Sequence, residues 1–130
     1  MPAASEGSGY TESYSKCVRL ITDAPKQSNG YYRRNYSICY DTSTLVSQWV
    51  AYPLHSCYTT PSIKRTDAWA FDPDIPEEQQ QNIVKGGYND GEYRQLDRGH
   101  MLPSASRYST YNTNAQTFYA TNIMPQNSSF

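Results

Sequence analysis

The sequence lacks a long apolar run, a recognisable export signal and an excess of basic residues. No segment approaches the roughly 18 consecutive apolar residues that cross a bilayer, which excludes a membrane-spanning helix. Residues 1–9 lack the basic and apolar segments of a signal peptide, so an exported form would have lost its leader. The 11 basic and 12 acidic residues give a net charge of -1, which does not favour a nucleic-acid-binding protein. A local positive potential at one site needs only a few side chains.

Cysteine is scarce as well. Cys17, Cys39 and Cys57 leave at least one thiol unpaired unless another chain supplies a partner. None of them forms a CxxC or Cys/His pattern, so a structural zinc site is not expected. The 13 tyrosines and the low number of lysines suit an exported protein. We therefore expect a secreted, periplasmic or cell-surface location.

The chain reads as a polar arm followed by one domain. Residues 1–15 are rich in Ser, Gly and Glu and predict a loose arm, which leaves 16–130 for the domain. Asn35 to Asp41 alternates, turn residues follow, and Leu45 to Tyr52 is rich in Val and aromatics, a pattern that predicts an antiparallel hairpin. The alternation places three large side chains on one face: Tyr36, Ile38 and Tyr40.

One helix and one further strand are predicted beyond the hairpin. Pro76 to Val84 has a proline and two glutamates for a first turn and Gly86-Gly87 for a stop, which predicts a helix. Acidic residues near its start suit the helix dipole better than a metal site. Thr117 to Ile123 alternates and predicts a strand with Phe118, Ala120 and Asn122 on one face. Strands with a short helix predict an α+β or mostly β domain.

The segment Asp97-Arg-Gly-His100 carries the chemistry. In an extended backbone Arg98 and His100 project to the same side. A neutral imidazole can take a proton from water, and a guanidinium can bind a phosphate through two parallel N–H groups. We interpret Gly99 as making room for a bulky substrate backbone. A lone histidine is more often a structural residue than a base, so this motif needs support from the rest of the chain.

That support is a resemblance to the DNA/RNA non-specific endonucleases, the ββα-metal or His-Me finger nucleases. Asp97 to His100 matches the family signature, Phe118 to Gln126 matches its second block, and Tyr36 to Tyr52 is similar to its early hairpin. The resemblance implies an α+β fold, an antiparallel sheet with flanking helices. It also implies hydrolysis of phosphodiester bonds in DNA and RNA without sequence preference, leaving 5′-phosphate ends.

The resemblance assigns roles to individual residues. His100 falls on the general base, Arg98 on a phosphate-contacting arginine, and Asn122 on an active-site asparagine that positions groups around the base. Asp97 is expected to tie its loop through hydrogen bonds, and an ion pair between Asp97 and Arg98 is a structural alternative for the arginine.

An upstream arginine of the family has no direct counterpart. The family carries this arginine just before a tryptophan, here aligned with Trp69, and the alignment puts Asp67 at its place. Arg65, two residues earlier, is the candidate substitute for binding the substrate.

The same resemblance implies a divalent cation, Mg²⁺ with Mn²⁺ as the alternative. The family's metal-binding asparagine lies on a helix after the second block, which would come just past Phe130. Asn127 aligns too early to replace it. We therefore expect no metal ligand within these residues, an incomplete endonuclease domain over 16–130, and little activity from this segment alone. DNA and RNA are the expected partners, with no membrane; a C-terminal fragment of the same protein and a homodimer stay open.

Two rival interpretations remain at this point. The first is a catalytically inactive relative or fragment that binds nucleic acid or a protein. The second is a tyrosine-rich surface for glycans or proteins, which predicts no metal dependence. We expect His55 to be structural. Tyrosines beside arginines can stack bases and contact phosphates, but an ordinary structural role is favoured for this set: Tyr31, Tyr32, Tyr108 and Tyr111 beside Arg33, Arg34 and Arg107.

Overall fold

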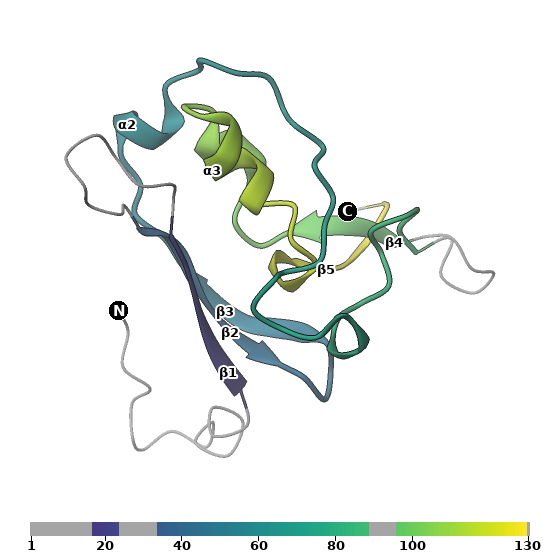
Figure 1. The fold of residues 1–130 in the computed structure, drawn as a ribbon. Coiled ribbons are helices and arrows are strands. Elements are labelled where there is room, and N and C mark those ends of the chain that lie inside the picture. Colours follow the sequence, from purple (N-terminus) through teal and green to yellow (C-terminus); the bar gives the residue numbers. More distant parts are fainter. Residues whose placement is uncertain (1–16, 24–33, 89–95, 130) are drawn as a thin grey trace.

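The computed structural model describes residues 17–23, 34–88 and 96–129. Their strands form two antiparallel sheets, one of three strands in the order β1-β2-β3 and one of two, β4-β5 (Figure 1). The elements are β1 (Cys17–Asp23), β2 (Arg34–Asp41), β3 (Val46–Ala51), α2 (Ser56–Thr59), η1 (Glu77–Gln79), β4 (Leu96–His100), η3 (Ser104–Arg107), α3 (Tyr111–Gln116), η4 (Ala120–Asn122) and β5 (Ile123–Asn127). The α+β class is confirmed. The expected arm over 1–15 lies outside the described residues.

The predicted hairpin is confirmed as β2 and β3. The two strands pair from Ser37 opposite Ala51 to Asp41 opposite Val46, with an irregularity after Cys39. Leu45, at the end of the turn, has a φ of 60°. Every residue of β2 after its first is buried, on both faces, because β2 is the central strand of its sheet. Cys39 is disulfide-bonded, and the thiol of Cys57 is free and exposed.

Two apolar clusters hold the elements together. The first joins the tyrosines and isoleucine of β2 to residues far along the chain: Tyr36, Ile38, Tyr40, Ile75 and Leu102. The second lies next to the β4-β5 pair: Ile83, Ala120 and Ile123, with Trp69, Phe71 and Tyr88 packed against them. Figure 1 shows the long teal connection between α2 and η1 running from the three-stranded sheet to the β4-β5 pair. The irregular residues thus form the bridge between the two sheets.

The helix predicted from Pro76 to Val84 is wrong. Only Glu77–Gln79 forms a single 3₁₀ turn, and Gln80 is already extended with φ −124° and ψ 159°. The buried amide of Gln80 accepts from the backbone N–H of Asp72 and donates to the carbonyls of Asp72 and Ile75. These tertiary hydrogen bonds hold the glutamine out of the helical path, so local helix signals are overridden.

The strand predicted from Thr117 to Ile123 is also wrong. Thr117 caps α3, Tyr119 makes an isolated bridge with Ala70, and the chain then forms the short helix η4. Strand β5 begins only at Ile123. The alternation of apolar residues therefore reflects burial of an irregular segment, because a short apolar run is buried equally well in a turn and in a strand.

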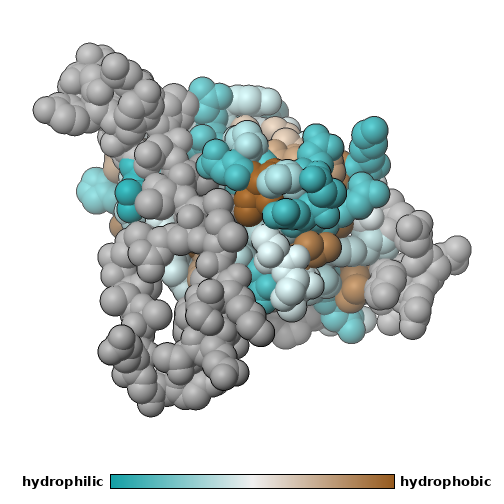
Figure 2. Space-filling model, turned by 60° about the horizontal axis from the view of Figure 1, so that its bottom comes forward, coloured by the Kyte–Doolittle hydropathy of each residue, from teal (hydrophilic) through white to brown (hydrophobic). Residues whose placement is uncertain are grey.

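Among the described residues, no helix is long and apolar enough to cross a membrane. On the face shown in Figure 2, apolar side chains reach the surface only in small areas between polar ones. Leu54, Tyr111 and Met124 are the large apolar side chains that stay exposed.

Candidate active site

Strand β4 presents the Asp97-to-His100 motif against β5. Arg98 pairs with Pro125, Gly99 with Met124 and His100 with Ile123. A Cβ atom on Gly99 would lie 2.8 Å from Oε1 and 2.9 Å from Cβ of Gln126. The interpretation that Gly99 makes room for substrate is therefore wrong. Gly99 is buried, and it lets β5 lie close to the strand that carries the base.

Arg98 and His100 project to the same side, as the extended backbone predicts, and both contact Trp69. The Cζ atom of Arg98 lies 3.5 Å from the centroid of the Trp69 ring. The His100 ring packs edge-on, with 5.5 Å between the two ring centroids. Arg98 also donates from Nη1 to the carbonyl of Ile83 at 3.0 Å. One indole thus sets the position of both groups.

Phe118 completes the surroundings of the imidazole. Its ring centroid lies 4.7 Å from that of His100 and 4.8 Å from that of Trp69, with edge-to-face geometry in both pairs. We call Trp69 and Phe118 the aromatic notch of His100. The sequence identified Trp69 only as an alignment marker, and Phe118 as a strand residue that begins the family's second block. No local pattern identifies them as neighbours of the base.

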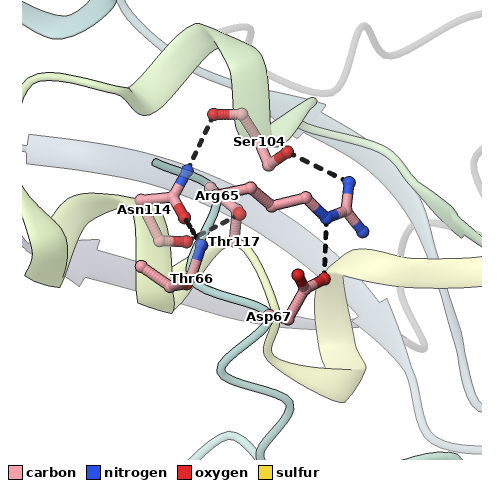
Figure 3. A network of polar contacts seen from close by, with 6 residues as sticks. All are labelled: Arg65, Thr66, Asp67, Ser104, Asn114 and Thr117. Atoms are coloured by element: carbon pink, nitrogen blue, oxygen red, sulfur yellow. Dashed lines mark hydrogen bonds and ion pairs between the residues drawn. The ribbon is translucent and has the colours of Figure 1, made fainter. Parts of the chain in front are cut away.

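Arg65 reaches the same notch from the loop before Trp69. Its Cζ atom lies 4.9 Å from the centroid of the Phe118 ring. Its Nε donates to Oδ1 of Asp67 at 2.7 Å, and its Nη1 donates to Oγ of Ser104 at 3.4 Å (Figure 3). Arg65 therefore lies close enough to act electrostatically on His100, and its role as the substitute for the family's upstream arginine stays a prediction.

Buried hydrogen bonds anchor the loop that carries Arg65. The backbone N–H of Thr66 donates to Oδ1 of Asn114, and Nδ2 of Asn114 donates to the carbonyl of Ser104, both at 2.9 Å. Asn114 lies on α3 and is fully buried. Figure 3 shows this amide between the loop and η3. Asn114 thus holds two backbone segments in place: the loop of Arg65, at Thr66, and η3, at Ser104.

The site keeps His100 uncharged. Burial lowers the pKa of His100 from 6.5 to about 4, and the positive charges of Arg65 and Arg98 act in the same direction, while Asp67 opposes them. Nε2 is buried and has no hydrogen-bond partner among the described residues. Nδ1 is therefore the ring nitrogen left for a water molecule. A neutral imidazole offers a lone pair at neutral pH.

Asn122 holds the backbone that follows His100. It is fully buried, and its Nδ2 donates to the carbonyls of Leu102 and Thr117 at 3.1 and 2.8 Å. Its Oδ1 accepts from the N–H of Leu102 at 2.9 Å. The amide does not reach solvent, and its expected part in positioning groups around the base stays a prediction.

Two other expectations are settled by the structure. Asp97 is exposed, and its side chain makes no hydrogen bond or ion pair with the residues that the structure describes, so neither the loop-tying role nor the pairing with Arg98 is found. His55 is structural, because its Nδ1 accepts from the N–H of Cys57 and caps α2.

Arg107 is fully buried, so its guanidinium has no surface for a contact with nucleic acid. Among the tyrosines considered for base stacking, Tyr111 is exposed. Tyr31, Tyr32 and Arg33 lie outside the described residues.

The described residues hold no large cluster of metal-ligating side chains. Within 17–23, 34–88 and 96–129, no three His, Cys, Asp or Glu side chains gather as metal ligands. Near the notch, the carboxylate of Asp67 is engaged by Arg65. Before η1, the buried carboxylate of Asp72 accepts from Thr121 Oγ1 at 2.7 Å and from the N–H of Asp74.

Two known nucleases are similar to this chain in sequence. A protein from Nostoc sp. (strain PCC 7120), named "Nuclease", is 34% identical over 94 residues, which cover 72% of this chain and 32% of that protein. The mitochondrial nuclease EXOG of Danio rerio is 31% identical over 97 residues, covering 72% of this chain and 26% of that protein. The chain thus spans about a third or less of the length of these relatives.

A solved structure and a family model also match. The crystal structure of an EndoG/EndoGI complex is similar with a TM-score of 0.49 and 24% identity, covering 70% of this chain and 36% of that one. The model of the family described as DNA/RNA non-specific endonuclease matches residues 18–130, which include both sheets and every residue of the notch. The chain therefore belongs to the DNA/RNA non-specific endonuclease family.

Proposed function

We propose that this protein is a metal-dependent endonuclease that hydrolyses phosphodiester bonds of DNA and RNA without sequence preference. The observation that carries the proposal is a neutral imidazole held in an aromatic notch between two guanidinium groups. A neutral imidazole with one free lone pair, beside two guanidinium groups, suits attack on a phosphate better than binding of a cationic or apolar ligand.

His100 is the general base of the proposed reaction. Its Nδ1 removes a proton from a water molecule, and the water oxygen forms a bond to phosphorus. The bond between phosphorus and the 3′ oxygen breaks, and that oxygen leaves with a proton from solvent. The phosphate stays on the 5′ end. A base of this kind contributes about 10²–10⁴-fold to the rate.

The substrate itself strengthens this base. A pKa of about 4 keeps His100 neutral but makes it a weak base in the free protein. A phosphate bound beside Arg65 and Arg98 adds negative charge near the imidazole, which favours the protonated form and raises the pKa of His100. Proton transfer thus becomes favourable when the scissile bond is in place.

Arg98 and Arg65 bind the phosphate. The guanidinium of Arg98 lies over the Trp69 ring and makes one hydrogen bond with the described residues, which leaves donors for phosphate oxygens. Contacts to phosphate carry no sequence information. This recognition of the backbone supports cleavage of both DNA and RNA without sequence preference.

We propose that the reaction depends on Mg²⁺, with Mn²⁺ as the alternative. Such an ion would neutralise oxygens on the phosphate during phosphoryl transfer. Mg²⁺ prefers oxygen ligands and keeps several waters, so one amide oxygen together with the substrate phosphates can suffice to hold it. Metal dependence is an inference from the family, since the described residues supply no ligand cluster.

Digestion assays test the proposal. Plasmid DNA and RNA are incubated with the full-length protein, including any segments that flank these residues, in Mg²⁺ or in EDTA. We expect both substrates to be cut in Mg²⁺, no cutting in EDTA, and a rate about 10²–10⁴-fold lower for His100→Ala. His55→Ala is the matched control and keeps the rate. Cutting that ignores both the chelator and His100→Ala would refute the mechanism. Absence of cutting with intact nucleic-acid binding would favour an inactive binding module.

A further inference from the structure

Asp67 is the acidic residue nearest to the cationic side of the notch. Its Oδ1 accepts from Nε of Arg65 at 2.7 Å, and both side chains are about half exposed, at 58% and 46%. Its negative charge also acts on Arg98 and on His100. One carboxylate is therefore close to all three groups that the proposed function assigns to the phosphate and to the base.

The pairing uses the part of Arg65 that a phosphate needs. A guanidinium recognises phosphate through two parallel N–H groups on one edge. With Nε on Asp67 and Nη1 on Ser104, each of the two edges of Arg65 has one nitrogen already engaged (Figure 3). A phosphate that binds Arg65 by two hydrogen bonds must replace one of these contacts.

The backbone holds the carboxylate in this place. Asp67 has a φ of 48°, a left-handed conformation that is uncommon outside glycine and is tolerated best by Asn and Asp. The carbonyl of Asp67 accepts from the N–H of Trp69 at 2.9 Å, which ties this turn to the notch. The position of the carboxylate is therefore coupled to Trp69, whose ring contacts Arg98 and His100.

We propose that Asp67 sets the affinity of the site for nucleic acid by occupying Arg65 in the free protein. This inference rests on the proposed function, because it takes the nucleic-acid phosphate as the ligand of Arg65. The carboxylate competes with the phosphate for Nε of Arg65. The result is weaker binding of the sugar-phosphate backbone than Arg65 and Arg98 alone would give.

Binding of a short fluorescein-labelled oligothymidylate by the full-length protein tests the proposal, with EDTA present so that the probe is not consumed. Asp67→Asn removes the charge, keeps the shape and tolerates the left-handed backbone. We expect the Kd of Asp67→Asn to fall about two- to fivefold, the size expected when an exposed ion pair no longer competes. Glu78→Gln, an exposed acid on η1, is the charge-matched control and leaves the Kd unchanged.

A double-mutant cycle separates competition for Arg65 from a change in net charge. In an Arg65→Gln background the effect of Asp67→Asn should vanish, because there is no guanidinium left to release. A Kd that stays the same or rises in Asp67→Asn overturns the proposal, and so does a decrease that persists in Arg65→Gln. If neither the parent nor Asp67→Asn binds the probe, both the inference and the proposed function fail. If the parent binds but Asp67→Asn shows no gain, only the inference fails.

Discussion

The molecule places arginine against aromatic rings in two regions, with opposite results. In the core, the Cζ atom of Arg107 lies 4.3 Å from the centroid of the Tyr58 ring and 5.4 Å from that of Tyr52. At the site, Arg98 lies 3.5 Å from Trp69. The ring contacts are alike, so they do not separate a structural arginine from a functional one.

The hydrogen bonds do separate them. Arg107 is fully buried and donates from Nε to Oδ1 of Asn35, from Nη1 to the carbonyl of Ser106, and from Nη2 to the carbonyls of Asn35 and Pro53. All three of its nitrogens donate to protein oxygens, and no carboxylate of the described residues forms an ion pair with it. Arg98 has one such bond. A guanidinium is available to a phosphate only where its donors are not already used.

Arg107→Lys should show the largest effect on stability. An ammonium group cannot replace the planar fork that reaches Asn35 and Pro53 together, so buried carbonyl groups lose their donors. We expect the free energy of unfolding, measured with urea, to fall by about 3 kcal/mol. Activity per folded molecule should stay unchanged. A loss of activity without a loss of stability would place Arg107 in the site and end the comparison.

Arg98→Lys is the same chemical change in the other region and should give the reverse result. The free energy of unfolding should fall by about 1 kcal/mol or less, because one hydrogen bond and one ring contact are weakened. The value of kcat/KM on DNA should fall about 10²-fold, as for other lost donors to a developing charge. Steady-state kinetics on the full-length protein measure this. Equal losses of stability in the two lysine variants would show that the two regions do not differ.

The sequence predicted the features that depend on residues close together in the chain. The hairpin of β2 and β3 follows from alternation and a turn within 35–52. The shared side of Arg98 and His100 follows from the two-residue period of a strand. The role of Arg65 was inferred from the family resemblance, through its distance from Trp69, and stays a prediction. These inferences need only neighbours in the chain.

The parts that the sequence did not predict depend on distant partners. The notch brings Trp69 and Phe118 to His100 from separate segments. Gln80 leaves the helical path because of buried bonds to Asp72 and Ile75. From composition alone, Gln80 is a polar helix former, and Trp69 and Phe118 are two aromatic residues. Tertiary hydrogen bonds and packing leave no local pattern in the sequence.

Glycine gave the clearest misreading. Gly99 suggests space for a substrate, but the space is filled by Gln126 of the neighbouring strand. The structural role favoured for Arg107 is confirmed, since its donors end on the backbone of β2 and of the segment after β3. The sequence allows either role at such positions, and the partners in the fold decide between them.

The charge state of His100 tests the region around Arg98 alone. The pKa of about 4 in the folded protein lies below the ordinary 6.5. As the pH falls, the unfolded chain therefore takes up the proton first. This group leaves stability unchanged above about pH 6.5 and lowers it progressively between pH 6.5 and 4. The kcat/KM profile should accordingly show no loss from protonation of His100 at pH 6.5.

Charge-removing variants on either side of the imidazole should move its pKa in opposite directions. Arg65→Gln removes a positive charge that disfavours the imidazolium, so the pKa of His100 should rise. Asp67→Asn removes the opposing negative charge, so the pKa should fall. Titration of the imidazole by NMR measures both, with His55→Gln assigning the second histidine signal. A shift of the same sign in both variants would mean that solvent access, and not the charges of Arg65 and Asp67, controls the base. Arg107→Lys, measured under folded conditions, should leave the pKa of His100 unchanged, since Arg107 is not among the charges that act on the imidazole.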